Sequence, residues 1–509
     1  MSVDIPSDIL WRICNAAWVP HIFIPGDVYA ESPRNEAVIK MSLASSRLRS
    51  FALALLFKEV YNWKRIAYKG GVWPSAVWPY IRTVNIFDRR YIPALSRIFN
   101  DRDLLDALPN LIATTQVKLR FTPDSPKGVS LPYLLAVSTL PALHTLKLQQ
   151  RRFDDPKLID VFVEMHQLSS LGLTLTELQD IPTVIDFRRE VAWDQEIDVV
   201  SEILQFFSTT LVELEVSGDL IELQMIASTK WPKLATLCLV NHIPYDDYQY
   251  LPVVVSQMPS LHTLHCNFRA EMMLRHPLIF CSSAEVHPPL SAVLPDLTSL
   301  SLSNIQPRDK IVEQLPSNSK ALHIVALRDH IVPDTSPYNY SGLTNADVIV
   351  WIDAAAKLPF LVRLSLGLKS APSPTLLAHI SRSCPGLEYL ELEQDFFEYN
   401  ENESSSLTLE LFIVPLQNLL RLRELRMSVE LGPSLEYLNP SGPASTPLAF
   451  VDRAQRTAML FAEKLPKLEF IGFSCATQFI LKFDRYCMWH MLEIIRQGGQ
   501  IHIRVAESI

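Results

Sequence analysis

Two short segments carry side chains of the types that do chemistry in proteins. His262, His265 and Cys266 lie within one stretch of five residues, and imidazole and thiolate groups are the usual ligands of zinc. Ser317 and Lys320 have the S-x-x-K spacing of a serine nucleophile and its lysine. Each segment therefore raises a specific possibility, a metal site in the first and nucleophilic catalysis in the second.

The chain around these residues argues against both possibilities. Cys266 occupies a position where related segments have leucine, so it should point inward, whereas His265 points to the opposite side of the same strand. Ser317 and Lys320 lie in a segment of turn composition and lack the companion motifs of S-x-x-K enzymes. The chain has only 14 glycines and no glycine-rich phosphate loop. We therefore expect no catalytic residue, no metal and no cofactor, and an enzyme is the least favoured function class.

The elements that position these side chains belong to a repeated phrase. Residues 140–148 and 231–239 follow the pattern Pro-x-Leu-x-x-Leu-x-Leu, and residues 258–266 follow it with Cys266 in place of the last leucine. Further copies with proline begin at residues 294, 358, 384 and 465, and looser copies begin at residues 81, 168, 211, 322 and 422. The last two apolar positions of each copy are two residues apart, so they lie on one face of a strand.

A single copy cannot bury its own apolar face, but stacked copies can. The closely spaced copies, such as those at Leu143 and Leu168 or at Leu234 and Leu261, are separated by roughly the 20–29 residues expected of leucine-rich repeats. The chain from about Ile81 onward therefore resembles an irregular leucine-rich-repeat solenoid, an α/β fold with a parallel β-sheet on the concave side and helices and loops on the convex side. The alternative is a leucine-rich globular domain with fortuitous spacing, which the common proline position disfavours.

Composition limits the remaining function classes. The net charge is −9 and the pI about 5.8, which disfavours a general nucleic-acid binder. From the first residues we expect no signal peptide, and no apolar run in the sequence is long enough to span a membrane. Cys238, Cys266 and Cys384 sit at positions that we interpret as apolar repeat positions, so we expect reduced core thiols in a cytoplasmic or nuclear protein.

The first 63 residues do not follow the repeat. Ile5-Pro6 precedes Ser7 and Asp8, which suit a helix start, and Ile9, Leu10 and Ile13 continue an apolar stripe. A second amphipathic stretch covers residues 41–51, and a third continues to residue 63. Between the first two stretches lies a long segment with one glycine and three prolines.

This arrangement resembles an F-box of the kind that basidiomycete fungi join to irregular leucine-rich repeats. The opening Ile-Pro dipeptide, the acidic residue, the basic pair around Leu48 and the closing aromatic residues carry the resemblance. It implies docking onto the Skp-type adaptor of a cullin ubiquitin ligase. The residues that the resemblance assigns to this contact are Ile5, Pro6, Ile9, Leu10, Ile13, Leu43, Leu48 and Phe51.

The alternative is that the N-terminal unit only caps the first repeat. A unit of this size has little core of its own, and residues 40–69 hold seven basic residues and one acidic residue, which suits an acidic partner. The predicted organisation is an F-box-like helical domain over 1–65, a junction over 66–80 and a repeat domain over 81–509. Within the repeats, helices are expected over 101–111, 197–207, 343–358, 448–464 and 486–496, with a closing strand over 501–505.

The repeat strands predict a surface for an unknown substrate protein. Side chains that alternate away from the leucines should line the concave face, and the candidates are Lys147, His265, Ser301, Ser365 and Glu391. The segment 391–403 carries six acidic and no basic residues together with Phe396 and Phe397; it is either a solvated loop or a recognition loop for a basic peptide. The sequence thus predicts a substrate-recognition adaptor of a ubiquitin ligase, with a protein-binding scaffold independent of any ligase as the alternative.

Overall fold

The structure is a computed structural model of the whole chain. The residues that it describes are 36–61, 73–87, 101–121, 131–150, 152–175, 189–241, 244, 251–268, 280–281, 288–306, 309–325, 343–394, 410–428, 448–476 and 487–506. By its internal contacts the chain divides into two compact units, Met1–Val216 and Ser217–Ile509.

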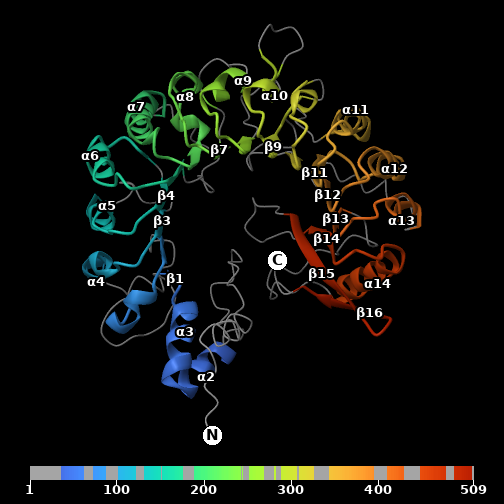
Figure 1. The fold of residues 1–509 in the computed structure, drawn as a ribbon, viewed down its shortest axis with the longest axis horizontal. Coiled ribbons are helices and arrows are strands. Elements are labelled where there is room, and N and C mark those ends of the chain that lie inside the picture. The colour runs from blue at the N-terminus through green and yellow to red at the C-terminus, as the bar shows by residue number, and fades with distance from the viewer. Residues whose placement is uncertain are drawn as a thin grey trace. The chain divides into compact units, whose positions relative to one another are not determined.

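The first unit is a ladder of parallel strands with one helix or turn between successive strands. Its strands are β1 (Glu59–Tyr61), β2 (Thr83–Phe87), β3 (Gln116–Arg120), β4 (Thr145–Gln150), β5 (Ser170–Leu175) and β6 (Glu213–Ser217), and each pairs in parallel with the next. Its helices are α2 (Glu36–Ala44), α3 (Ser46–Leu56), α4 (Asp101–Ala107), α5 (Leu131–Ser138), α6 (Lys157–Val163) and α7 (Arg189–Phe207), with 3-10 turns at Ser75–Tyr80 and Leu108–Asn110. Figure 1 shows α4, α5 and α6 together on one side of these strands.

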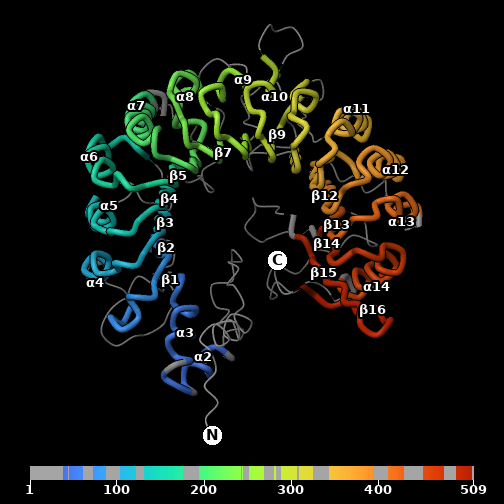
Figure 2. The backbone as a smooth tube through the Cα atoms, viewed as in Figure 1, coloured from blue at the N-terminus to red at the C-terminus, as the bar shows by residue number. Residues whose placement is uncertain are grey.

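The second unit repeats this plan and ends differently. Its parallel strands are β7 (Thr236–Asn241), β8 (Thr263–Phe268), β9 (Ser299–Ser303), β10 (Ala321–Val325), β11 (Arg363–Leu368), β12 (Tyr389–Gln394), β13 (Glu424–Met427) and β14 (Phe470–Ala476). Strands β15 (Cys487–Gln497) and β16 (Gln500–Val505) then pair in antiparallel fashion. Its helices are α8 (Leu223–Ser228), α9 (Leu251–Val254), α10 (Leu290–Val293), α11 (Asn345–Ala355), α12 (Pro374–Ser383), α13 (Glu410–Leu416) and α14 (Leu448–Lys464), with 3-10 turns at Gly218–Leu220, Val255–Gln257 and Val312–Gln314. In Figure 2 the tube shows α11, α12 and α13 in succession on one side of β11 to β13.

The core of each unit consists of the apolar positions that the repeat predicted. In the first unit Leu146 pairs with Leu171, and Leu148 with Leu173, and all four side chains are buried. In the second unit Leu364 pairs with Leu390 and is fully buried. Each buried leucine stabilises the fold by about 1.5–3 kcal/mol, so the rows stabilise the ladder where one copy could not. These pairings show an α/β leucine-rich-repeat solenoid fold, and the predicted fold class is confirmed.

Two repeats depart from the predicted positions. Strand β3 was not predicted. In other copies a leucine stands at the buried position before the strand, but here that position is taken by Thr114. Thr114 also lies three residues further from the preceding Leu-Pro pair than that leucine does in other copies. The copy predicted to begin at Leu322 begins three residues earlier, since Leu322 pairs with both Leu300 and Leu364. Ser319 takes the first leucine position there, and its buried hydroxyl donates to the Leu297 carbonyl at 3.0 Å.

The predicted convex-side helices agree well with the structure. Helix α14 covers the predicted range, and α4 falls within its own. Thr344 is the N-cap of α11 and forms a capping box with Asp347. Helix α7 begins at Arg189, eight residues before the predicted start.

The predicted second N-terminal helix over 41–51 is in fact two helices. Ser45 separates α2 from α3 and caps α3, because its hydroxyl accepts a hydrogen bond from the Leu48 amide at 3.1 Å. The predicted third helix ends at Leu56, and its continuation contains strand β1, which pairs with β2. The parallel ladder therefore starts within the range 1–65.

The predicted helix over 486–496 is wrong, because β15 occupies this segment. Gly498 and Gly499 both have positive φ, 57° and 80°, as a two-residue hairpin turn requires. Leu492 and Ile494 alternate inward along β15 and are buried. The closing strand over 501–505 is confirmed as β16, in an antiparallel hairpin that ends the parallel ladder.

Candidate functional site

The face of each ladder opposite the leucine rows carries side chains in rows of its own. We call the row at the strand centres the central row; in the second unit it comprises Cys238, His265, Ser301, His323, Ser365, Glu391, Arg426 and Gly472. The row two residues earlier, the leading row, includes Ser299, Ala321, Arg363, Tyr389 and Glu424. Strand pairing thus brings His265, Ser301, Ser365 and Glu391 onto one face, as the alternation predicted. We call this face the polar face.

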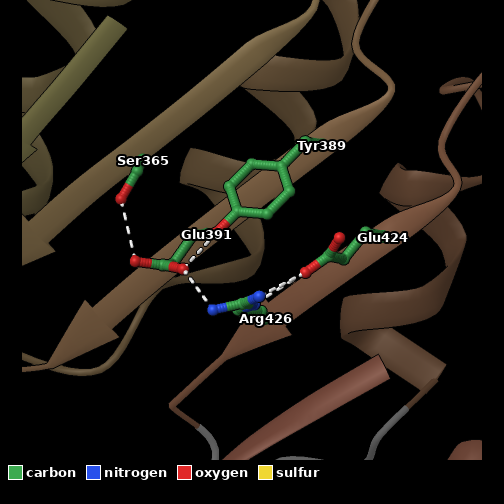
Figure 3. A network of polar contacts seen from close by, with 5 residues as sticks. All are labelled: Ser365, Tyr389, Glu391, Glu424 and Arg426. Carbon is green, nitrogen blue, oxygen red and sulfur yellow. Dashed lines mark hydrogen bonds and ion pairs between the residues drawn. The ribbon is translucent and has the colours of Figure 1, made fainter. Parts of the chain in front are cut away.

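A network of polar contacts surrounds Glu391, which is only 8% exposed (Figure 3). The Ser365 hydroxyl donates to one carboxylate oxygen at 3.0 Å, and the Tyr389 hydroxyl donates to the other. The guanidinium of Arg426 lies 3.5 Å from Glu391 and 2.6 Å from Glu424. Five hydrogen-bonding or charged groups therefore share this cluster, and the buried Glu391 is a structural centre whose charge is already paired.

Tyr389 makes two contacts in this network, one through its hydroxyl and one through the face of its ring. Its hydroxyl binds Glu391, and burial, followed by the hydrogen bond to Glu391, raises the pKa of the phenol well above its usual range. The guanidinium carbon of Arg363 lies 4.1 Å from the centre of the Tyr389 ring. Arg363 is exposed, and among the described residues no carboxylate forms an ion pair with it. The Tyr389 ring therefore positions the Arg363 guanidinium by a cation–π contact, and no carboxylate neutralises this cation in the described part of the chain.

The other end of the central row holds a thiol and two imidazoles. Cys238 Sγ lies 3.5 Å from His265 Nδ1, which pairs with it across β7 and β8. Cys238 was predicted as a core thiol, and this is wrong, because it lies on the polar face and is half-buried. Cys266 is buried on the leucine side as predicted, and burial raises its pKa. His323 is half-buried; burial lowers its pKa, and its Nε2 has no hydrogen-bond partner among the described residues.

In the first unit the central row comprises Asn85, Lys118, Lys147, Gly172 and Glu215. Lys147 Nζ reaches Glu215 at 2.5 Å although strand β5 lies between their strands. The residue between them is Gly172, and an added Cβ there would lie 3.1 Å from Lys147 Cγ. Glycine thus lets the lysine cross to its acid, so Lys147 is paired, whereas Lys118 has no ion-pair partner within the described residues.

Gly472 has the corresponding position beside Arg426. An added Cβ would lie 2.6 Å from Met491 Sδ and 3.3 Å from Arg426 Cγ. Backbone without a side chain therefore makes room for a long basic side chain in both units.

Of the predicted adaptor-binding residues, the structure describes those on α2 and α3. Leu43 on α2 is 72% exposed, and Ile39, one turn earlier on the same face, is 47% exposed. Leu48 and Phe51 on α3 are half-buried. Ile5, Pro6, Ile9, Leu10 and Ile13 lie outside the described residues, as do Phe396 and Phe397.

The predicted substrate-binding residues differ in what they present to a partner. Ser301 and Ser365 are only 3% and 6% exposed and bind Asn267 and Glu391. Lys147 and Glu391 are paired, and His265 contacts Cys238. Arg363, Tyr389 and Arg426 were missed, although each stands at an alternate strand position that the repeat pattern could have located.

The described residues hold no group of three or more histidine, cysteine, aspartate or glutamate side chains placed to bind a metal ion. Ser317 and Lys320 lie in the turn before β10, and Ser317 has no base within hydrogen-bonding distance in the described residues. Within this part of the chain, no helix combines the length and apolar character needed to cross a bilayer.

Comparisons with known proteins add one likeness of fold. No protein-family model matches the chain, and no curated protein matches it. Among the solved structures that match is the leucine-rich repeat-containing protein LegL7 from Legionella pneumophila, at 13% sequence identity and a TM-score of 0.34, covering 71% of this chain and 97% of that one. The strand register of the chain itself carries the assignment: this is a leucine-rich-repeat fold.

Proposed function

We propose that the chain is a protein-binding scaffold that uses the polar face of its repeats. The observation that carries the proposal is the register of the strands, which places polar and charged side chains in continuous rows within each unit. A partner laid across several strands would meet one side chain from each repeat, so that many repeats contribute to one interface. Arginine, tyrosine and histidine in these rows suit such an interface, since arginine and tyrosine are enriched in binding hot spots.

Site-specific photo-crosslinking tests the scaffold proposal. A benzoylphenylalanine placed at Lys118, on the polar face of β3, should give a discrete crosslinked protein in cell extract. The same probe at Val350, an exposed apolar position on α11, is the control. Two outcomes would refute a partner on the polar face. One is that positions 118 and 350 give the same crosslinked protein in equal yield. The other is that neither position 118 nor a second polar-face position, Arg363, gives a crosslink.

In a second candidate function, the same scaffold works as part of a ubiquitin ligase. We infer that the N-terminal helices dock the chain onto a Skp-type adaptor, so that the repeats present a substrate protein for ubiquitin transfer. Ile39 and Leu43 favour this reading, because they form an apolar pair on one side of α2 that is exposed in the described part of the chain. Such a pair is suited to a partner helix, and the exposed basic residue Lys40 stands between them in the sequence.

A binding assay with purified Skp-type adaptor tests this docking. Burying one leucine contributes about 1.5–3 kcal/mol, so Ile39→Asp with Leu43→Asp should weaken binding at least tenfold. Leu135→Asp on α5, another leucine that is 47% exposed, should leave binding unchanged. Wild-type chain that fails to bind the adaptor would eliminate the ligase reading and leave the scaffold reading intact.

A further inference from the structure

We propose that Arg363 and Tyr389 form an anion-recognition site on the polar face, which takes an acidic side chain of a bound protein. The proposal rests on the protein-binding function above and names the chemistry of the partner. It reverses the charge of one of the two interpretations of the sequence, in which the segment 391–403 is a recognition loop for a basic peptide rather than a solvated loop.

The charges of this patch explain the reversal. Glu391 and Glu424 both lie within ion-pair distance of Arg426, and Glu391 also accepts from Ser365 and Tyr389. Arg423, at the start of β13, lies 3.7 Å from Glu469. Among these paired groups Arg363 is the guanidinium that lacks a carboxylate within the described residues.

The guanidinium of Arg363 is also preoriented. It stacks on the Tyr389 ring at 4.1 Å, and that ring is fixed through its hydroxyl by Glu391. Stacking uses the face of a guanidinium and leaves its N–H groups at the edge available for hydrogen bonds. A planar fork of donors matches a carboxylate or a phosphate in a two-point contact.

Small side chains lie beside Arg363 in its own row. Its strand partner on the side away from Tyr389 is Ala321, and the next residue in that row is Ser299. His323 lies two residues along β10 from Ala321, on the same face, and its Nε2 has no hydrogen-bond partner in the part of the chain that the structure describes. The leading row thus presents a fixed cation beside two short side chains, and a peptide segment laid across the strands would meet Arg363 next to them.

Peptide selection on the full-length chain tests the site. Random dodecapeptides are selected in parallel on the wild-type chain, on Arg363→Ala and on Arg504→Ala, a control in which an exposed arginine on β16 loses its ion pair with Glu493. We expect the wild type and Arg504→Ala to enrich peptides with an aspartate or glutamate at a fixed position. Arg363→Ala should lose this preference, and Arg363→Lys should retain part of it, because lysine keeps the charge but not the fork.

Synthetic versions of an enriched peptide then separate the possible anions. Replacing the fixed acid by its amide should weaken binding to the wild type roughly 10- to 100-fold, as expected for a charge-assisted contact, and should have no effect on Arg363→Ala. A phosphoserine version that binds tighter than the carboxylate version would assign the site to phosphorylated segments.

Two results would overturn the proposal. Enriched peptides without a fixed acid would refute the anion site while leaving a protein-binding face in place. A second contrary result is that no peptide is enriched although photo-crosslinking captures a partner. The face then does not bind extended acidic segments, so the anion-site proposal fails while the scaffold proposal stands. Circular dichroism and the thermal unfolding midpoint of Arg363→Ala, each compared with the wild type, control for misfolding.

Discussion

At the scale of single residues, buried acids in this chain take very different roles according to their neighbours. Glu391 is surrounded by an arginine and two hydroxyls, whereas Asp309 accepts only backbone hydrogen bonds from the described residues. Its carboxylate accepts from the amides of Phe280, Cys281 at 3.1 Å and Ile311 at 2.8 Å. Burial nevertheless raises the pKa of Asp309 to about 6, although the three amides lower it. Asp309 therefore joins residues 280–281 to the segment at 309–311 with a group that titrates close to neutrality.

The substitution Asp309→Asn should remove a pH dependence of stability. The folded protein holds the Asp309 proton up to about pH 6, whereas the ordinary pKa of the group is 3.8. Folding therefore takes up a proton between these values, so this group's stabilisation is complete below pH 3.8 and is lost as the pH rises through 6. Denaturant titrations at pH values from 4 to 7 should show that the Asn variant lacks this decline.

Asp296→Asn, at an exposed aspartate, is the control and should keep the slope of the wild type. Equal slopes for the wild type and Asp309→Asn would mean that the Asp309 carboxylate does not titrate in this window.

At the scale of elements, the chain uses side chains to end its helices and to close its ladder. Ser45 and Thr344 cap α3 and α11, and the hairpin of β15 and β16 closes the second unit. Arg496 on β15 links the closing hairpin to the end of a helix. Its guanidinium donates to the carbonyl of Leu468 at 2.5 Å, and to those of Ala462 at 3.0 Å and Leu465 at 2.9 Å. The hairpin thus satisfies carbonyls at the C-terminal end of α14.

The substitution Arg496→Ala should loosen the end of α14. Charged hydrogen bonds contribute about 1.5–3 kcal/mol, and solvent screening of this partly exposed arginine reduces the expected loss to about 1–2 kcal/mol. Hydrogen exchange should therefore accelerate roughly 5- to 30-fold in the last turn of α14, with little change in α11.

Arg504→Ala provides the matched control for this experiment. Arg504 pairs with Glu493 on the same hairpin, but 60% of its side chain is exposed, so its loss should change stability by about 0.5 kcal/mol or less. If both variants accelerate exchange in α14 equally, the hairpin as a whole supports the helix and the carbonyl contacts of Arg496 do not.

At the scale of the whole molecule, the repeat solves the problem of a long chain without requiring one large core. Each unit is a ladder in which a strand contacts mainly its neighbours, so a chain of 509 residues buries its leucines copy by copy. The same regularity produces rows on the polar face, and glycine interrupts these rows at Gly172 and Gly472 beside long basic side chains. The pattern that builds the core therefore also spaces the residues offered to a partner.

The fold was predictable because its signal is local. Leucines three and two residues apart, repeated behind a proline, suffice to place strands such as β4, β7 and β8 and to predict which side chains face away from the core. Where a polar residue takes a leucine position, as Thr114 and Ser319 do, the local signal is lost and the strand or its register is missed. The β15 hairpin carried a local signal too, the Gly498-Gly499 turn, but the apolar residues before it also suit a helix.

The sequence by itself determined the leucine rows, and with them the alternation that puts Arg363, Tyr389 and Glu391 on one face. Only the tertiary structure decided which charges on that face are neutralised. Glu391 meets Arg426 from the next strand, and Lys147 meets Glu215 from two strands away. These partners lie 35 and 68 residues apart along the chain. Their pairing depends on strand register and on the empty position at Gly172, and it leaves Arg363 as the cation without a counter-ion in the described part of this patch.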